Sequence, residues 1–284
     1  MLLPAFEYAR PQSVEEALAE LGRHRNARVI AGGQTLLNAL KLRVAQPDVL
    51  VDVSRLEELR AISADADGGL RIGAAVTYDE LAGSPLVREH HPVTAAMSAR
   101  LVDRQVRARG TVGGNVCLAD PTSNFPPLLV ALGASLSVDG PDGSREVAAD
   151  AFFLAPYVTA VLPGELLVEV RLPPLAPGER VGYESLQLGT DSWALARASV
   201  LVRSNGAIEH ARVVLGCGPV PVRQPAMEAA LRGAATAESV EAAAELAGED
   251  FEPPTDVHAS SEYRRAMGKV MATRAVLAAT REDA

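Results

Sequence analysis

The sequence predicts an α+β protein whose last third is an antiparallel sheet backed by helices. Short apolar runs at 28–31, 49–53 and 166–172 have the length and composition of buried strands. Between them, apolar residues recur three and four positions apart, which is the spacing of amphipathic helices. Because 48% of the 284 residues are hydrophobic, the chain can bury the cores of two domains.

The first elements are marked by helix caps and glycines. Ser13 stands three residues before Glu16, and this capping-box pattern predicts a helix start. The strand at 28–31 runs into a pair of glycines, and leucines with helical spacing begin at Leu36. The next predicted elements are strands at 49–53 and 70–73 and helices that begin after Thr77 and at Pro92.

Hairpin signals follow in the second half of the chain. A helix is predicted at 128–132, with Pro127 in its first turn. The predicted hairpins join strands at 135–139 and 145–147, and strands at 199–203 and 208–215. Two alanine-rich amphipathic helices are expected at about 225–246 and about 260–281.

The domain organisation follows from a proline- and glycine-containing linker at 175–178. We expect a first domain at residues 1–176, with two parts at about 1–56 and 57–176. A second, smaller domain is expected at residues 179–284.

Composition excludes several classes of protein. A net charge of −9 disfavours binding to nucleic acid, whose phosphates repel an acidic chain. Two cysteines are too few to ligate a Cys₄ iron–sulfur cluster. The N-terminus lacks the pattern of a signal peptide, and no run of about 20 apolar residues predicts a membrane span. We therefore expect a cytoplasmic protein.

The first candidate binding motif comprises Ala31, Gly32, Gly33, Gln34 and Thr35, between a predicted strand and a predicted helix. Glycines permit positive φ and the close approach of phosphate oxygens. Successive N–H groups at a helix start attract anions. The same glycines would also suit a plain strand-to-helix turn.

The second motif comprises Thr111, Gly113, Gly114 and Asn115 and is followed by Asp120 and Pro121. It again offers glycines, a hydroxyl and an amide, although an ordinary turn has the same composition. As two nests of N–H donors, the motifs together suit a diphosphate held from two sides. Neither fits the GxGxxG pattern of nicotinamide dehydrogenases or the P-loop pattern of NTPases.

These residues resemble the flavin-carrying medium subunits of bacterial molybdenum hydroxylases, the xanthine dehydrogenase and carbon monoxide dehydrogenase family. The stretch AGGQTLLNALKLR, from Ala31 to Arg43, resembles their AGGxSLLxxxKLR. TVGGN from Thr111, with ADP ending at Pro121, resembles their TxGGNxxxADP. The opening at 4–8 and the segment 261–265 are also similar, so the resemblance covers nearly the whole chain.

The resemblance implies a two-part FAD-binding domain of the vanillyl-alcohol-oxidase type, followed by a smaller C-terminal α+β domain. It implies FAD in this chain. It also implies two partners: a small subunit with iron–sulfur clusters and a large subunit with the molybdenum cofactor. The activity would be that of an oxidoreductase, and the substrate stays open among carbon monoxide, purines, aldehydes and N-heterocycles.

The resemblance also assigns candidate FAD contacts, although it assigns no catalytic residue. The two glycine motifs would hold the pyrophosphate. Asp120 and Asn124 would lie in a loop that contacts FAD, and Leu101 and Val102 would pack near the second motif. Leu162 matches a position that contacts the adenine through its backbone.

One segment departs from the family. Relatives often carry lysine and arginine at 183–188, where this chain has Ser185 and Gln187. Because a cation near a flavin favours the anionic reduced form, this difference leaves the electron acceptor open. Trp193, the single tryptophan, stands where relatives often place an aromatic residue beside the flavin. The alternative for Trp193 is a place in the core of the C-terminal domain.

No metal site is expected in this chain. His90 and His91 are adjacent, and neighbouring residues on a helix do not face one another.

The sequence therefore predicts an FAD subunit that takes electrons from an iron–sulfur partner and passes them to an external acceptor. Two alternatives are a stand-alone FAD oxidoreductase of the same fold and a non-catalytic assembly subunit that has lost FAD.

Overall fold

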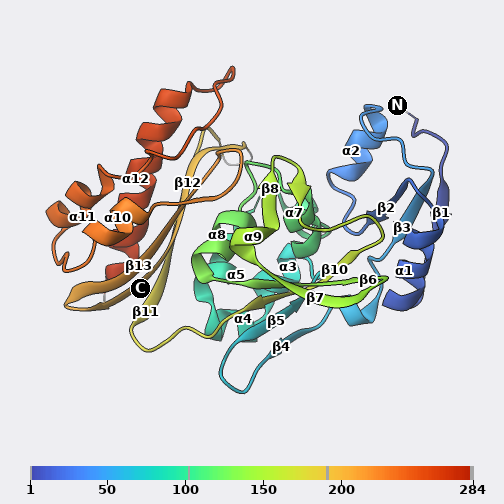
Figure 1. Ribbon diagram of the computed structural model, residues 1–284, viewed down its shortest axis with the longest axis horizontal. Coiled ribbons are helices and arrows are strands. Elements are labelled where there is room, and N and C mark those ends of the chain that lie inside the picture. Colours follow the sequence, from blue (N-terminus) through green and yellow to red (C-terminus); the bar gives the residue numbers. More distant parts are fainter. Residues whose placement is uncertain (1, 102, 190–191, 282–284) are drawn as a thin grey trace.

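The computed structural model describes residues 2–101, 103–189 and 192–281. Figure 1 shows three sheets side by side, with the N-terminal sheet and the C-terminal sheet at opposite ends of the molecule and a mixed layer of strands and helices between them. Among the described residues, no helix is long and apolar enough to span a bilayer. The α+β fold predicted from the sequence is confirmed.

The N-terminal sheet is parallel, in the order β1–β3–β2. Its elements are β1 (Glu7–Ala9), α1 (Val14–Arg23), β2 (Ala27–Ile30), α2 (Leu36–Lys41) and β3 (Val49–Asp52). The predicted cap is confirmed, because the Glu16 N–H donates to the Ser13 hydroxyl at 3.1 Å. Ala17 and Leu21 of α1 pack with the apolar residues of β3 into a small core.

The middle sheet is antiparallel, in the order β4–β5–β10–β6–β7. Its strands are β4 (Ile62–Ala64), β5 (Leu70–Gly73), β6 (Ser135–Gly140), β7 (Gly143–Ala148) and β10 (Leu166–Leu172). The β6–β7 pair confirms the first predicted hairpin. A two-stranded ribbon of β8 (Phe153–Ala155) and β9 (Val158–Thr159) follows the short helix α9 (Ala149–Phe152).

Helices cover this sheet and join it to its neighbours. They are η1 (Glu57–Leu59), α3 (Tyr78–Gly83), α4 (Pro85–His90), α5 (Pro92–Ala99), α6 (Arg104–Arg107), α7 (Val112–Leu118) and α8 (Phe125–Leu132). Thr77 caps α3 through a full capping box, as predicted. All eight residues of α8 are buried, because the helix contacts the C-terminal sheet as well as the core of the middle layer.

The C-terminal sheet is antiparallel, in the order β11–β12–β13–β14. Its elements are β11 (Glu179–Gln187), β12 (Ala194–Asn205), β13 (Ala207–Gly216), β14 (Val222–Arg223), α10 (Pro225–Ala230), α11 (Ala237–Ala244) and α12 (Ser261–Thr280). The β12–β13 pair confirms the second predicted hairpin, and α12 confirms the closing helix. The domain boundary near 176–179 stays a prediction.

One helix prediction is wrong. The stretch 225–246 forms two helices, α10 and α11, instead of one. Gly233 has a φ of +81°, which interrupts a right-handed helix. Thr236 then starts α11 with a capping box, in which its side chain accepts from the Ser239 N–H.

Candidate cofactor site

The two glycine motifs line one cleft. Its volume is about 640 Å³, within the range of about 300–1,000 Å³ common for small-molecule sites. The cleft lies between the N-terminal sheet, α7 and the β8–β9 ribbon. The predicted site residues that line it are Ala31, Gly32, Gly33, Gln34, Thr35, Thr111, Gly113, Gly114, Asn115 and Leu162.

The first motif packs against the chain just before the second. A Cβ on Gly32 would overlap the carbonyl oxygen of Arg109 and lie 2.9 Å from the Gly110 Cα. Only glycine permits this approach of two backbones. Gly33 has a φ of +70°, which a side chain rarely tolerates. Glycine is therefore required at the two positions for different reasons. At Gly32 there is no room for a Cβ, and at Gly33 the backbone has a positive φ.

The first motif presents a run of free N–H groups to the cleft. Among the described residues, none accepts a hydrogen bond from the N–H of Gly32, Gly33, Gln34 or Thr35. Thr35 is the N-cap residue of α2, but its side chain makes no capping hydrogen bond. Four successive unpartnered N–H groups are the donors that an anion-binding nest requires. This arrangement matches the prediction for the first motif.

The second motif is built differently, and the prediction that it is also a nest of free N–H donors is wrong. The N–H groups of Val112 and Gly113 donate to Val76 O at 2.9 Å and Ala74 O at 2.8 Å. The Gly114 N–H donates to the Thr111 hydroxyl oxygen at 3.1 Å, since Thr111 caps α7. With these donors used internally, the motif offers the cleft side chains: the Thr111 hydroxyl and the Asn115 amide.

Asn115 carries an unsatisfied acceptor. Its Oδ1 is buried and has no hydrogen-bond partner within the chain. Its side chain also forms a hydrogen bond with the Tyr78 hydroxyl, which opposes the effect of burial; burial still raises the pKa of Tyr78 to about 12. A buried amide oxygen without a partner is uncommon and marks a place where a ligand donor can bind.

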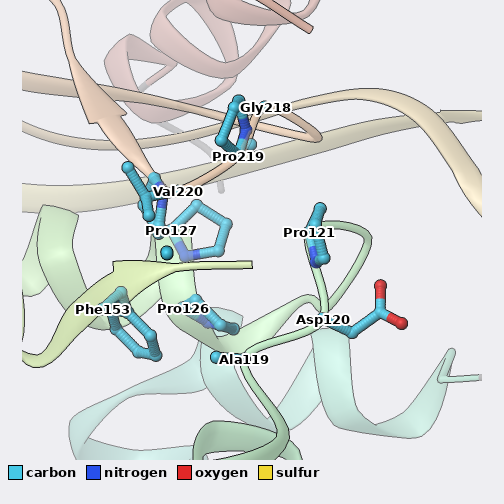
Figure 2. A pocket seen from close by; sticks show the side chains of 12 residues that line it. Ala119, Asp120, Pro121, Pro126, Pro127, Phe153, Gly218, Pro219 and Val220 are labelled. Atoms are coloured by element: carbon cyan, nitrogen blue, oxygen red, sulfur yellow. The ribbon is translucent and has the colours of Figure 1, made fainter. Parts of the chain in front are cut away.

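Tyr157 contributes an aromatic side chain to the cleft, and no sequence motif marks it. Its φ is +61°, and its N–H donates to Ala119 O at 3.0 Å. Its hydroxyl donates to Asp120 Oδ2 at 3.1 Å. The pKa of Tyr157 is raised, first by burial and then by the Asp120 carboxylate. Asp120 itself does not line the cleft; it borders a small pocket at the edge of the C-terminal domain (Figure 2).

The Leu162 backbone is already hydrogen-bonded to Glu165. The Leu162 N–H donates to Glu165 Oε2 at 2.7 Å, and Leu162 O accepts from the Glu165 N–H at 3.0 Å. Arg145 binds the same carboxylate and lowers the pKa of Glu165. A backbone contact from Leu162 to a ligand therefore depends on the second lone pair of its carbonyl oxygen.

The remaining predicted site residues either do not line the cleft or lie outside the residues that the structure describes. Leu101 is buried in the core of the middle layer, and Val102 lies outside the described residues. Asn124 accepts a hydrogen bond from the Tyr183 hydroxyl. Trp193 is 66% exposed, so its alternative place in a core is wrong, although it does not line the cleft.

Comparison with protein families identifies the family to which the chain belongs. The family described as "FAD binding domain in molybdopterin dehydrogenase" matches residues 4–175. The family described as "CO dehydrogenase flavoprotein C-terminal domain" matches residues 182–279. The chain belongs to the FAD-binding medium subunits of the molybdenum hydroxylases.

Individual relatives match over their full length. The carbon monoxide dehydrogenase medium chain of Hydrogenophaga pseudoflava is 39% identical over 98% of both chains. The nicotine 6-hydroxylase medium subunit of Paenarthrobacter nicotinovorans is 32% identical over 98% of this chain and 99% of the relative.

Solved structures of the family have the same fold. Carbon monoxide dehydrogenase from Hydrogenophaga pseudoflava, in a form lacking the Mo-pyranopterin moiety, aligns with a TM-score of 0.94 and 41% identity over 98% of both chains. Quinoline 2-oxidoreductase from Pseudomonas putida 86 aligns with a TM-score of 0.94 and 33% identity, also over 98% of both chains.

The residues of the cleft fit FAD, the cofactor of this family. A diphosphate is an anion that accepts hydrogen bonds, which suits the free N–H groups of 32–35. Arg25 and Arg28 line the cleft and add positive charge. Asn115 Oδ1 can accept from a hydroxyl or amine of the ligand. Within the described residues, no cluster of His, Cys, Asp or Glu is arranged to hold a metal ion.

Proposed function

We propose that this chain is the electron-transferring FAD subunit of a cytoplasmic molybdenum hydroxylase. It receives electrons from an iron–sulfur subunit and passes them to an external acceptor. The observation that carries the proposal is the row of four free N–H groups at 32–35 beside a cleft of about 640 Å³. Flavin, once bound, supplies the chemistry, because it can exchange electrons singly or in pairs.

Each part of the cleft has a separate role in binding. The N–H groups of 32–35 bind the diphosphate, and Gly32 keeps this motif against Arg109. Thr111 and Asn115, which line the same cleft, orient the cofactor through their side chains. The remaining predicted contacts, including Leu162 and Trp193, are part of the same proposal.

The partners are inferred from the composition and from the relatives. Two cysteines cannot build the Cys₄ clusters that deliver single electrons, so those clusters belong to another chain. The relatives are called medium chains or medium subunits, names that belong to larger assemblies. We propose a small iron–sulfur subunit and a large molybdenum-binding subunit as the two partners.

The flavin content of the purified chain tests the first half of the proposal. Acid precipitation followed by chromatography should release about one FAD per chain into the supernatant. A chain without flavin supports the assembly-subunit alternative. FMN, or flavin that stays in the pellet, contradicts non-covalent FAD binding.

Co-expression with the neighbouring reading frames tests the second half. The expected result is one complex that contains this chain, iron–sulfur clusters and molybdenum. Reduction of the flavin by substrate, with no dithionite added, should require all three subunits. If the chain alone oxidises substrate at the rate of the complex, the stand-alone oxidoreductase is correct instead.

A further inference from the structure

The segment Asp120–Asn124, which we call the bridging segment, is bound by two strands of the C-terminal sheet and by the residue that follows a third. Just beyond β13, the Cys217 N–H donates to Pro121 O at 3.1 Å. From β12, Arg197 Nη1 donates to Thr122 O at 2.7 Å and also to Ser123 O. From β11, the Tyr183 hydroxyl donates to Asn124. The bridging segment is therefore fixed from outside its own domain.

Arg197 is the unusual member of this set. Its side chain is 1% exposed, yet among the described residues it forms no ion pair with a carboxylate. Its Nε has no hydrogen-bond partner. A buried charge without a counter-charge is unfavourable unless its hydrogen bonds are made. Among the described residues, the carbonyl oxygens of Thr122 and Ser123 in the bridging segment are the backbone acceptors of Arg197, so the segment and the guanidinium hold each other in place.

The bridging segment is linked to the cleft by the hydrogen bond between Asp120 and Tyr157. The Asp120 carboxylate accepts from the Thr122 N–H at 2.8 Å and from the Thr122 hydroxyl at 2.6 Å. Its other oxygen accepts from the Tyr157 hydroxyl at 3.1 Å. Tyr157 lines the cleft and has a φ of +61°, a conformation that depends on outside contacts. Figure 2 shows Asp120 and Pro121 on the same loop, and Gly218 and Pro219 of the C-terminal domain line the same small pocket.

We propose that Arg197 is a positioning residue for the FAD cleft. Arg197 fixes the carbonyl groups of Thr122 and Ser123. Thr122 in turn holds the Asp120 carboxylate, and that carboxylate holds Tyr157 at the cleft wall. The inference rests on the proposed location of FAD in this cleft. It means that cofactor affinity depends on a residue of the C-terminal sheet that does not itself line the cleft. By linkage, the factor by which this contact between the two domains strengthens FAD binding is also the factor by which bound FAD strengthens the contact.

A double-mutant cycle on the full chain tests the proposal. FAD is removed, and its dissociation constant is measured by fluorescence titration for wild type, Arg197→Lys, Tyr157→Phe and the double variant. We expect each single variant to weaken FAD binding about three- to tenfold. Because both act through one chain of contacts, the double variant should bind about as weakly as the weaker single variant. Effects that multiply independently in the double variant overturn the proposal.

Conservative rescue separates positioning from general stability. Arg197→Met removes the charge and both hydrogen bonds of Nη1, and it should weaken FAD binding at least tenfold, with Arg197→Lys recovering part of the loss. The matched control is Arg203→Met, on the same strand, whose side chain pairs with Glu209 at the surface. If Arg197→Met does not fold, the cycle with Arg197→Lys and Tyr157→Phe decides alone. Wild-type affinity in Arg197→Met overturns the proposal.

Different results would contradict the proposed function and the role of Arg197. If wild type binds no FAD, or if Gly33→Val retains it fully, FAD does not occupy this cleft. If wild type binds FAD and Gly33→Val loses it while every Arg197 variant binds normally, the proposed function stands and the role of Arg197 is wrong.

Discussion

Gly32 lies directly against the main chain of Arg109, so close that a Cβ on the glycine would be 2.8 Å from the Arg109 carbonyl carbon. This contact places the two glycine motifs next to each other in the lining of one cleft. Any side chain at Gly32 must move one motif away from the other.

Gly32→Ala should therefore weaken FAD binding at least tenfold, which corresponds to about 1.4 kcal/mol. Overpacking of this kind also destabilises the fold by about 1–3 kcal/mol. Titration with FAD and thermal unfolding measure the two effects. The control is Gly22→Ala in α1, where a Cβ meets nothing within 4 Å. In that variant the free energy of unfolding should rise by about 0.5–1 kcal/mol. Normal affinity in Gly32→Ala would show that the contact is dispensable.

Gly33→Val and Gly114→Val should both lose FAD, for different reasons. Valine at Gly33 is strained at a φ of +70° and turns the N–H groups of the first motif away. Gly114 does not have a positive φ; instead its Cβ would lie 2.8 Å from Thr111 Oγ1 and displace that hydroxyl. The flavin content of each purified variant, with circular dichroism to confirm folding, measures the outcome. Full flavin in Gly33→Val means that the first motif does not hold the diphosphate, and full flavin in Gly114→Val means that the Thr111 hydroxyl does not contribute to FAD binding.

Asn115→Asp should weaken FAD binding about tenfold or more, and the loss should shrink at high salt. The change keeps the shape of the side chain but places a carboxylate beside a bound diphosphate, where like charges repel. Titrations at two ionic strengths measure the effect. Asn205→Asp makes the same charge change at the exposed end of β12 and should bind FAD normally. Equal affinity in both variants would remove Asn115 from the site.

Trp193→Ala should change the free energy of unfolding by less than about 0.5 kcal/mol, because the side chain is 66% exposed. If the indole packs against bound flavin as the resemblance implies, the variant should also bind FAD up to about tenfold more weakly, with brighter flavin fluorescence. Fluorescence of the bound flavin and the thermal midpoint are compared in one sample. A large drop in the thermal midpoint with unchanged fluorescence would contradict packing of the indole against the flavin.

Because His91 is buried, we expect the protein to lose stability in mild acid. Burial lowers the pKa of His91 from 6.5 to about 4, and its Nε2 lies 3.0 Å from Pro173 O. Above pH 6.5 the imidazole is neutral in both states and has no effect. Between pH 6.5 and about 4 the unfolded chain binds the extra proton, so the free energy of unfolding falls by about 3 kcal/mol in total.

Denaturant unfolding across this pH range measures the slope. His91→Gln should flatten it, whereas His258→Gln, at an exposed position, should leave it as in wild type. A wild-type slope in His91→Gln would assign the acid sensitivity to other groups.

Local features were decided by the sequence alone. Ser13 and Thr77 cap helices as predicted, and the turns at 140–143 and 204–206 close the expected hairpins. Gly33 takes the positive φ expected of a strand-to-helix turn. These features depend on dihedral angles and hydrogen bonds within a few residues, so the residues that specify them are neighbours in the chain. The motif pair was also enough to identify the family.

The tertiary structure decided which donors remain free. Thr111–Asn115 has the composition of a second nest, but Val76 and Ala74, from another part of the chain, accept its first N–H groups. The contact of Gly32 with Arg109, the path from Arg197 to Tyr157 and the exposure of Trp193 likewise join residues far apart in sequence. A hydrogen-bond donor binds whichever acceptor packing brings within about 3 Å, and no local pattern encodes that partner.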